Sequence, residues 1–161
     1  MTNKKTVIFI ASSGGHLTQL LQLQPIFKEF NSYIITEKDI TTNELSGRVG
    51  DSAKILYIPE TRKKSKCQYL KGNIGTLLKS IKYYFQIKPD AIISTGAGIS
   101  VYLNYIAKLF GKKIIFIETY AAIRGKSQAG KLIYPIADKF YIQWKSLQKI
   151  YPHGLYKGTL Y

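Results

Sequence analysis

The stretch VIFIASSGGHLTQL, residues 7–20, decides the fold of this chain. Its apolar run over residues 7–11 is unbroken, which is typical of a strand buried on both faces of a parallel sheet. Gly14 and Gly15 allow a sharp turn, and Leu17, Leu20 and Leu21 recur at helical spacing. The stretch therefore predicts a strand, a glycine turn and a helix, and we expect this helix to run to about Phe30.

The glycine turn is also a candidate phosphate site. The first N–H groups of a helix and the helix dipole attract anions, and His16 would lie at the mouth of the site. The turn has neither the Gly-x-Gly-x-x-Gly pattern of dinucleotide-binding folds nor the Gly-Lys-Ser/Thr of a P-loop. An ordinary strand-to-helix turn with a surface histidine is the alternative interpretation.

Size and charge narrow the class of protein. A length of 161 residues predicts one domain, residues 1–161, with a substantial core. Lysine and arginine outnumber aspartate and glutamate by 24 to 9, which indicates a polyanionic partner such as nucleic acid, anionic lipid or a phosphorylated substrate. The single cysteine, Cys67, excludes an internal disulfide and fits a reducing compartment. We expect no signal peptide, no transmembrane helix, no metal and no cofactor.

Strands and helices alternate along the rest of the sequence. Apolar runs predict strands at residues 33–36, 54–58, 91–94, 114–117 and 140–143. Helices are expected at residues 100–110, 132–137 and 144–151, and a loop with a short helix at residues 37–51. Such alternation predicts an α/β fold, a Rossmann-like parallel sheet with helices on both faces.

The region between Glu60 and Asp90 contains no acidic residue but many basic ones. Apolar residues recur there at helical spacing from Ile74 to Phe85, which predicts an amphipathic helix. Basic and aromatic side chains on such a helix suit an anionic lipid surface. The candidate membrane-contacting residues are Lys71, Leu77, Leu78, Lys79, Lys82, Tyr84 and Phe85. The alternative is that the apolar stripe packs on the sheet and the basic face is only solvated.

Three predicted strands end in polar or glycine-rich segments. Ser13–His16 follows the first strand, Thr95-Gly96-Ala97-Gly98 follows residues 91–94, and Glu118 follows residues 114–117. In open α/β sheets, ligands bind beyond the carboxyl ends of the strands. These segments are therefore expected to converge at one edge, where a loop over residues 119–130 adds the cations Arg124 and Lys126.

Taken together, these segments resemble a known family. With residues 130–132 and 138–144, and in this order, they are similar to the N-terminal, acceptor-side half of MurG-like glycosyltransferases of GT-B fold. The resemblance is closer to stand-alone versions of that half. These are the bacterial PssD/CpsF/EpsE type of polysaccharide-synthesis subunit and the membrane-anchor subunit of the eukaryotic dolichol-linked UDP-GlcNAc transferase.

The resemblance implies a two-component glycosyltransferase for capsular or exopolysaccharide synthesis. This chain would bind the polyprenyl-diphosphate-linked sugar and an anionic membrane surface, and would recruit or activate a catalytic partner that binds the UDP-sugar. It would be cytoplasmic and peripheral on the inner face of the plasma membrane. Whether this chain supplies the catalytic base or only anchors and enhances its partner is left open.

Roles for individual residues follow from this hypothesis. His16 is the candidate general base, and Glu118 is its rival, a ligand for the acceptor hydroxyl, or only the cap of a neighbouring loop. The candidate diphosphate ligands are Ser13, Gly14, Gly15, Thr95, Gly96, Gly98, Arg124 and Lys126. The aromatic residues Trp144, Tyr151 and Tyr156 are candidate partner contacts, unless this segment packs on its own sheet.

Two other classes of function compete with this hypothesis. The first is a free-standing Rossmann-like enzyme that binds a nucleotide or another small molecule. The second is a nucleic-acid-binding module, which the charge favours. The sequence contains no helix-turn-helix, RNP or zinc signature, so a nucleic-acid partner is not expected.

Overall fold

A seven-stranded parallel sheet forms the centre of the molecule, in the order β3-β2-β1-β4-β5-β6-β7. The computed structural model describes residues 4–39, 42, 44–59 and 66–161. The strands are β1 (Thr6–Ile10), β2 (Asn31–Glu37), β3 (Lys54–Ile58), β4 (Ala91–Ser94), β5 (Lys113–Ile117), β6 (Lys139–Ile142) and β7 (Leu155–Tyr156). The predicted Rossmann-like fold class is confirmed.

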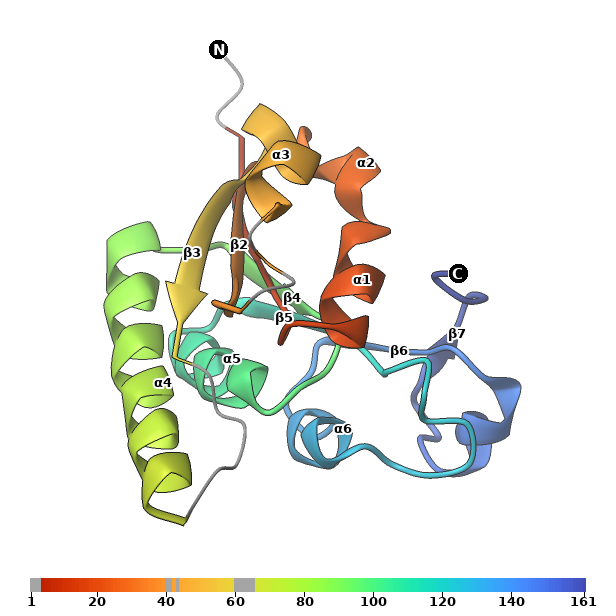
Figure 1. Ribbon diagram of the computed structural model, residues 1–161. Helices are drawn as coiled ribbons and strands as arrows, with labels where there is room; N and C mark the ends of the chain where they lie inside the picture. The colour runs from red at the N-terminus through yellow and green to blue at the C-terminus, as the bar shows by residue number, and fades with distance from the viewer. Residues whose placement is uncertain (1–3, 40–41, 43, 60–65) are drawn as a thin grey trace.

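Helices lie on both faces of this sheet (Figure 1). They are α1 (Gly15–Leu21), α2 (Gln24–Phe27), α3 (Leu45–Val49), α4 (Lys66–Ile87), α5 (Ile99–Leu109) and α6 (Gln128–Ile133), with the 3-10 turns η2 (Gly50–Ser52) and η3 (Lys145–Lys149). Side chains of α1, α2 and α3 share a core with one face of the sheet, and those of α4, α5 and α6 share a core with the other.

Strand β1 contributes side chains to both hydrophobic cores, because both faces of the sheet are covered at this strand. Ile8 and Ile10 belong to the core on the α5 side, whereas Phe9 and Ala11 belong to the core on the α1 side. Its neighbours are β2 and β4, and Phe9 pairs in register with residues of both. Burial on both faces explains why the run over residues 7–11 contains no polar residue.

The first helix is shorter than predicted. Helix α1 ends at Leu21. The next residues form 3-10-type hydrogen bonds, from Gln22 N to Gln19 O and from Leu23 N to Leu20 O, and a second helix, α2, follows. The cause is Pro25, whose ring would clash with the carbonyl of Leu21 in a continuous helix. Proline is tolerated in the first turn of a helix, and it occupies that position in α2.

Two predictions in the second half of the chain need correction, and one strand was missed. Helix α6 begins at Gln128, not at residue 132, because the Ser127 hydroxyl accepts a hydrogen bond from Gly130 N and caps the helix. The segment after Trp144 forms the short 3-10 turn η3 in place of an α-helix. The strand β7 was not predicted, since it is only two residues long.

Candidate functional site

The point where the chain changes direction lies between β1 and β4, which are neighbours at the centre of the sheet. After β1 the chain enters α1 on one face, and after β4 it enters α5 on the other face (Figure 1). The turns that follow the two strands therefore face each other at the carboxyl edge. Ligands of open α/β sheets bind in the crevice at such a switch point.

His16 and Thr95 bridge this switch point through two hydrogen bonds. The His16 ring Nδ1 lies 2.9 Å from the main-chain oxygen of Thr95, and the Thr95 hydroxyl donates to the main-chain oxygen of His16 over 2.7 Å. A carbonyl oxygen only accepts, so Nδ1 must carry the proton. In the neutral ring Nε2 is then the acceptor, and within the described residues it has no hydrogen-bond partner. The two hydrogen bonds fix the orientation of the imidazole ring.

Gly96 makes room for this histidine. A Cβ atom at residue 96 would lie 2.8 Å from both Nδ1 and Cε1 of His16, and the φ angle of Gly96 is +102°. Glycine adopts this backbone region without the steric penalty that other residues meet. The sequence therefore needs glycine here for two reasons, a close approach and a left-handed turn.

The turns themselves have uncommon backbone geometry. Gly14 precedes α1 with a φ angle of +83°, and its oxygen accepts both the N–H and the hydroxyl of Thr18. Ala97 has a φ angle of +72°, which is rare for a residue with a side chain. Gly98 follows as the N-cap of α5. The predicted residues Ser13–His16, Thr95, Gly96 and Gly98 are thus brought to one edge.

Glu118 has a structural position that the sequence hypothesis gave only as its third alternative. Its side chain is 0% exposed and accepts hydrogen bonds from the Tyr151 hydroxyl at 2.6 Å, Thr119 N at 2.9 Å and Ser127 N at 3.4 Å. It closes the loop over residues 119–127 at both ends. A carboxylate enclosed in this way is a loop cap, which corrects its assignment as a catalytic base.

Tyr151 is the buried partner of that carboxylate. It is 0% exposed, so its assignment as a contact for another protein is wrong. Burial, together with the hydrogen bond and the negative charge of Glu118, raises the pKa of the Tyr151 hydroxyl far above its ordinary value of 10.0. The hydroxyl therefore stays protonated and keeps donating to Glu118. A tyrosine buried beside a carboxylate that is distant in sequence leaves no signal in the sequence.

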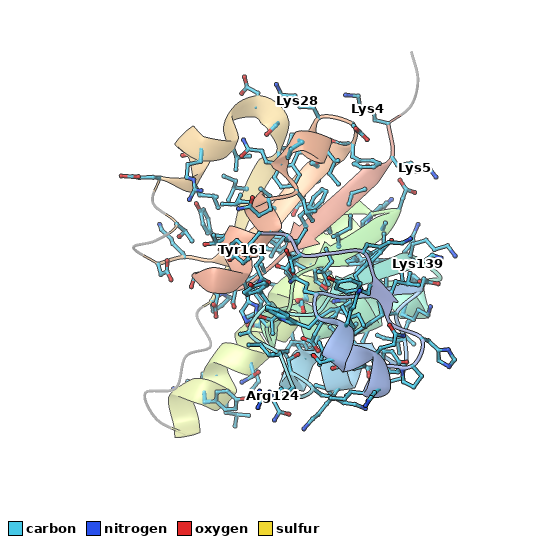
Figure 2. All side chains as sticks on the ribbon, turned by 90° about the vertical axis from the view of Figure 1, so that its right-hand side faces the viewer. Lys4, Lys5, Lys28, Arg124, Lys139 and Tyr161 are labelled. Atoms are coloured by element: carbon cyan, nitrogen blue, oxygen red, sulfur yellow. The ribbon has the colours of Figure 1, made fainter. Side chains whose placement is uncertain are left out.

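The loop over residues 119–127 carries the two predicted cations. Arg124 and Lys126 are exposed and line an open depression of about 580 Å³ formed by the loop. The Lys126 ammonium lies 5.3 Å from the centre of the Tyr151 ring. Figure 2 places Arg124 at the opposite end of the molecule from Lys4 and Lys28.

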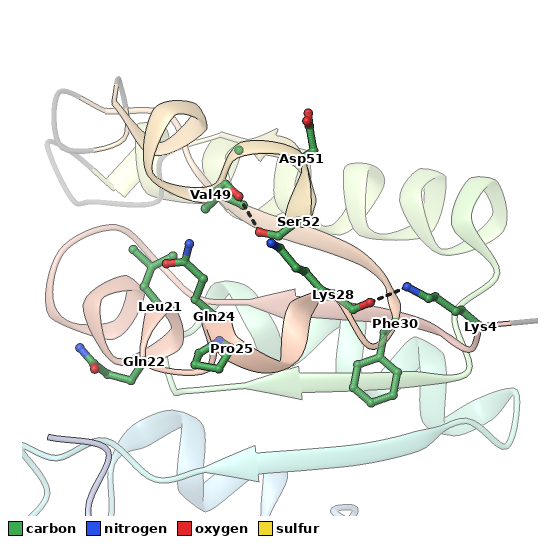
Figure 3. A pocket seen from close by; sticks show the side chains of 11 residues that line it. Lys4, Leu21, Gln22, Gln24, Pro25, Lys28, Phe30, Val49, Asp51 and Ser52 are labelled. Carbon is green, nitrogen blue, oxygen red and sulfur yellow. Dashed lines mark hydrogen bonds between the residues drawn. The ribbon is translucent and has the colours of Figure 1, made fainter.

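A second hollow lies at that opposite end. It has a volume of about 930 Å³ and is bordered by α2, η2 and the residues before β1 (Figure 3). Lys4 donates from its ammonium to the main-chain oxygen of Lys28, and both line the hollow beside Ser52. Since the hollow lies at the amino ends of the strands, it is separate from the predicted site.

Helix α4 presents its apolar side chains to solvent. Among residues 69–87 of this helix, those that are buried are Thr76, Ser80 and Tyr84, at 0%, 2% and 5% exposure. The apolar ridge, as we name the exposed apolar side of α4, comprises Leu70, Ile74, Leu77, Leu78, Ile81 and Phe85. The alternative that this stripe packs on the sheet is therefore wrong.

Two of the predicted membrane-contacting residues face inward. Tyr84 is buried and stacks on Phe110 with a centroid distance of 5.0 Å, which corrects its assignment to the membrane-facing set. Lys79 donates over 2.9 Å to the main-chain oxygen of Tyr57, so its ammonium is held at β3. The basic residues Arg62, Lys63 and Lys64 lie outside the described residues. In the described part of the chain, no helix has the length and apolar character needed to cross a membrane.

The aromatic residues near the end of the sequence divide into buried and exposed ones. Trp144 is half-buried and donates from its indole N–H to the main-chain oxygen of Tyr120 over 2.7 Å. Tyr156 is 37% exposed and Tyr161 is 57% exposed. An apolar groove of about 300 Å³ lies beside them, between Ile115, Tyr141 and residues 157–160. Exposed apolar surface of this kind is available for a contact.

Comparisons with known proteins identify relatives over nearly the whole chain. The family model described as "Oligosaccharide biosynthesis protein Alg14 like" matches residues 6–160. The UDP-N-acetylglucosamine transferase subunit alg14 of Schizosaccharomyces pombe is 29% identical over 176 residues, with 98% of this chain and 84% of that protein covered. The human subunit ALG14 is 27% identical over 180 residues, with 96% of this chain and 82% of that protein covered.

Solved structures with the same fold are longer proteins. Acinetobacter baumannii MurG superposes with a TM-score of 0.68 at 16% identity, covering 88% of this chain but 42% of MurG. A UDP-N-acetylglucosamine 2-epimerase from Rickettsia bellii gives a TM-score of 0.72 at 13% identity, covering 98% and 45%. The chain thus spans less than half of these proteins and has the fold of one half of a GT-B glycosyltransferase such as MurG.

Proposed function

This chain belongs to the Alg14-like family of oligosaccharide biosynthesis proteins, and from that premise we propose that it is one subunit of a two-component glycosyltransferase. The enzyme transfers a sugar from a UDP-sugar to a sugar carried by a polyprenyl diphosphate. The observation that carries the proposal is the family match over residues 6–160, together with relatives named as UDP-N-acetylglucosamine transferase subunits. Residues 1–161 act as a single acceptor-binding domain.

The acceptor diphosphate binds at the carboxyl edge of the sheet. The first N–H groups of α1 and α5 have no partner within their helices, and those near Gly15 and Gly98 lie on either side of the switch point. Ser13 and Thr95 belong to the same two turns. Arg124 and Lys126 supply positive charge, and arginine matches phosphate oxygens with paired donors.

His16 removes the proton from the acceptor hydroxyl. Its Nδ1–H is committed to Thr95, so Nε2 takes the proton as the hydroxyl oxygen bonds to the anomeric carbon of the donor sugar. The bond between that carbon and UDP breaks, and UDP leaves with the electron pair. Glu118 has no part in this step because its oxygens are enclosed.

The donor site belongs to a second protein. The relatives are named as subunits of a UDP-N-acetylglucosamine transferase, and this chain matches one half of the MurG fold, which supports a partner that carries the donor half. Exposed aromatic groups such as Tyr156, together with Trp144 and the apolar groove beside residues 157–160, support a docking surface there. The partner supplies the UDP-sugar and is recruited or activated by this chain.

The membrane contact is made by the apolar ridge of α4. Six large apolar side chains exposed on one helix favour burial in a lipid surface, and Lys71 and Lys82 flank them with positive charge. The amino end of α4 follows β3 at the carboxyl edge of the sheet, the edge that binds the acceptor (Figure 1). The proposed location is the cytoplasmic face of the plasma membrane, with peripheral attachment.

The biological context is a finer part of the same proposal. We place the chain with the PssD/CpsF/EpsE type of subunit in capsular or exopolysaccharide biosynthesis. This part is supported by the resemblance of its glycine turns and of residues 117–119, 130–132 and 138–144 to that type.

Transfer of radiolabelled sugar to a lipid-linked acceptor in membranes tests the proposal. The four arms are this chain alone, the candidate partner alone, both together, and both with His16→Ala. Activity that needs both proteins and is lost in His16→Ala is the expected result. Full activity of the partner alone would overturn the proposal and favour a free-standing nucleotide-binding enzyme.

A further inference from the structure

The loop that carries Arg124 and Lys126 is held at both ends by one side chain. Glu118 accepts from Thr119 N at the start of the loop and from Ser127 N at its end. Gly130 packs against this arrangement, since a Cβ there would meet the Glu118 Oε2 and the Tyr151 hydroxyl. The loop is therefore closed around a buried carboxylate.

Two further bonds hold the middle of the same loop. The Trp144 indole donates to Tyr120 O over 2.7 Å, and the Ser146 hydroxyl donates to Ile123 O over 2.6 Å. Both donors come from the segment that follows β6. The two cations are thus displayed on a loop whose main chain is fixed at four places, and this loop forms the depression they line.

Residues 160 and 161 are attached to this system in two ways. Leu160 N donates to the Gln143 Oε1 over 2.9 Å, and the Gln143 Nε2 donates to Glu118 O over 2.9 Å. The rings of Tyr161 and Tyr120 pack edge to face, with centroids 5.2 Å apart. Gln143 is 2% exposed and uses both ends of its amide, one on each segment.

From this geometry we propose that Gln143 is a positioning residue that couples residues 157–161 to the acceptor loop over residues 119–127. The inference rests on the proposed function, in which the loop cations bind the acceptor diphosphate and residues near 156 contact the partner. A partner that holds residues 157–161 in place thereby fixes the main chain at Glu118 and the direction of Arg124 and Lys126. Partner docking and acceptor affinity are then linked through one amide.

The first arm of the test measures hydrogen–deuterium exchange in the full chain without a partner. Leu160→Pro removes the single N–H that Gln143 accepts, and Leu160→Ala keeps it. Gln143→Leu removes both bonds, while Gln148→Leu removes an exposed amide that bonds Pro152 O and Gly154 O. We expect the amides of residues 119–127 to exchange about two- to tenfold faster in Leu160→Pro, as loss of one hydrogen bond predicts, and at least as much faster in Gln143→Leu, which loses two; both controls should exchange at the wild-type rate.

Trp144 provides a second readout, because it is the single tryptophan and it bonds to the loop. Its emission should shift to longer wavelength in Leu160→Pro and stay unchanged in Leu160→Ala. Unaltered exchange and emission in both Leu160→Pro and Gln143→Leu would overturn the coupling. Equal effects of Leu160→Pro and Leu160→Ala would also overturn it, since side-chain packing would then be the cause.

The second arm measures kinetics of the two-protein enzyme with Leu160→Pro at saturating concentrations of the partner, because Leu160 lines the groove proposed for docking. The KM for the lipid-linked acceptor should rise about two- to tenfold, while kcat and the KM for the UDP-sugar stay at wild-type values. A fall in kcat with an unchanged acceptor KM would contradict a positioning role. If the wild-type pair transfers no sugar, the proposed function fails, and the exchange data still decide whether the two segments are coupled.

Discussion

His16 and Thr95 hold each other across the switch point of the sheet, each through a side chain that bonds to the main chain of the other. The pair joins the turn after β1 to the turn after β4, which are 79 residues apart in sequence. The main-chain oxygen of Thr95 fixes the proton on Nδ1 and leaves Nε2 as an acceptor. The same contact orients the ring and determines which ring nitrogen is basic.

Replacement of His16 should lower the rate of sugar transfer much more than replacement of its partner Thr95. In the two-protein assay, His16→Ala should lower kcat by about 10²- to 10⁴-fold, the contribution of a positioned general base. Thr95→Val should cost far less, because it removes the hydroxyl but keeps the main-chain oxygen that orients Nδ1. Equal losses of kcat in the two variants would contradict this role of the carbonyl.

Gly96 offers an independent test of the same geometry. Gly96→Ala would place a Cβ 2.8 Å from the His16 ring at a φ angle of +102°, so we expect loss of transfer and a lower free energy of unfolding by at least about 1 kcal/mol. The control is Gly47→Ala in α3, where no atom lies within 4 Å and the φ angle is not left-handed. It should be neutral or stabilising by about 0.5–1 kcal/mol in denaturant unfolding.

Tyr151→Phe should reveal the structural role of Glu118. The change removes a 2.6 Å hydrogen bond to a buried carboxylate and should lower the free energy of unfolding by about 1–3 kcal/mol. Tyr156→Phe, at an exposed tyrosine, is the matched control and should leave stability unchanged. In the two-protein assay, Glu118→Gln should keep the wild-type pH dependence of kcat. A shift of the pH–kcat profile in this variant would instead support Glu118 as the catalytic base.

Membrane binding should depend on the apolar ridge. Ile74→Ser with Leu78→Ser should reduce flotation with anionic vesicles by at least about tenfold, because burial of each side chain contributes about 1.5–3 kcal/mol. The free energy of unfolding should not fall, since both residues face solvent. Leu132→Ser on α6 is the control, because Leu132 and Ile74 are each 50% exposed. Flotation that drops equally in the control would argue against a specific ridge.

The lowered pKa of the Asp138 carboxyl predicts that the free energy of unfolding depends on pH. Burial raises the pKa of its carboxyl, but the bond from Ile114 N and the ammonium groups of Lys108 and Lys113 outweigh burial and hold the pKa below 3.8. A carboxyl with a lowered folded-state pKa stabilises the protein above its unfolded-state pKa, and this contribution is lost as pH falls through the folded-state pKa.

Asp138→Asn should therefore cost roughly 0.5–1 kcal/mol at pH 7. The difference from wild type should shrink below about pH 4. Urea unfolding at pH 7, 4 and 3 measures it. A difference that is constant with pH would assign the effect to packing instead of charge.

Much of the fold follows from local patterns in the sequence. The unbroken apolar run at β1, the strand at residues 91–94 and the helix that follows it were predicted from the sequence and are observed. Parallel order follows from the alternation of strands and helices, because each crossover must return to the same edge. The convergence of His16 with Thr95 and Gly96 follows in turn, since parallel strands end together.

Other features depend on contacts between distant residues. Helical periodicity located the amphipathic helix α4, but it does not tell which stripe faces the sheet, and here small polar residues such as Thr76 and Ser80 are buried. Tyr151 was assigned to an interface because aromatic residues favour both interfaces and cores. Its pairing with Glu118 spans 33 residues and depends on how β5 and η3 are packed.

The sequence by itself determined the α/β class, the glycine turns and the place of His16 at the first of them, because strand period, helix period and turn chemistry are local properties. Only the tertiary structure decided that Glu118 caps a loop, that Gln143 joins this loop to Leu160, and that α4 turns its apolar side outward. Burial and hydrogen-bond partners arise when distant segments pack together, and one residue type accommodates several such environments.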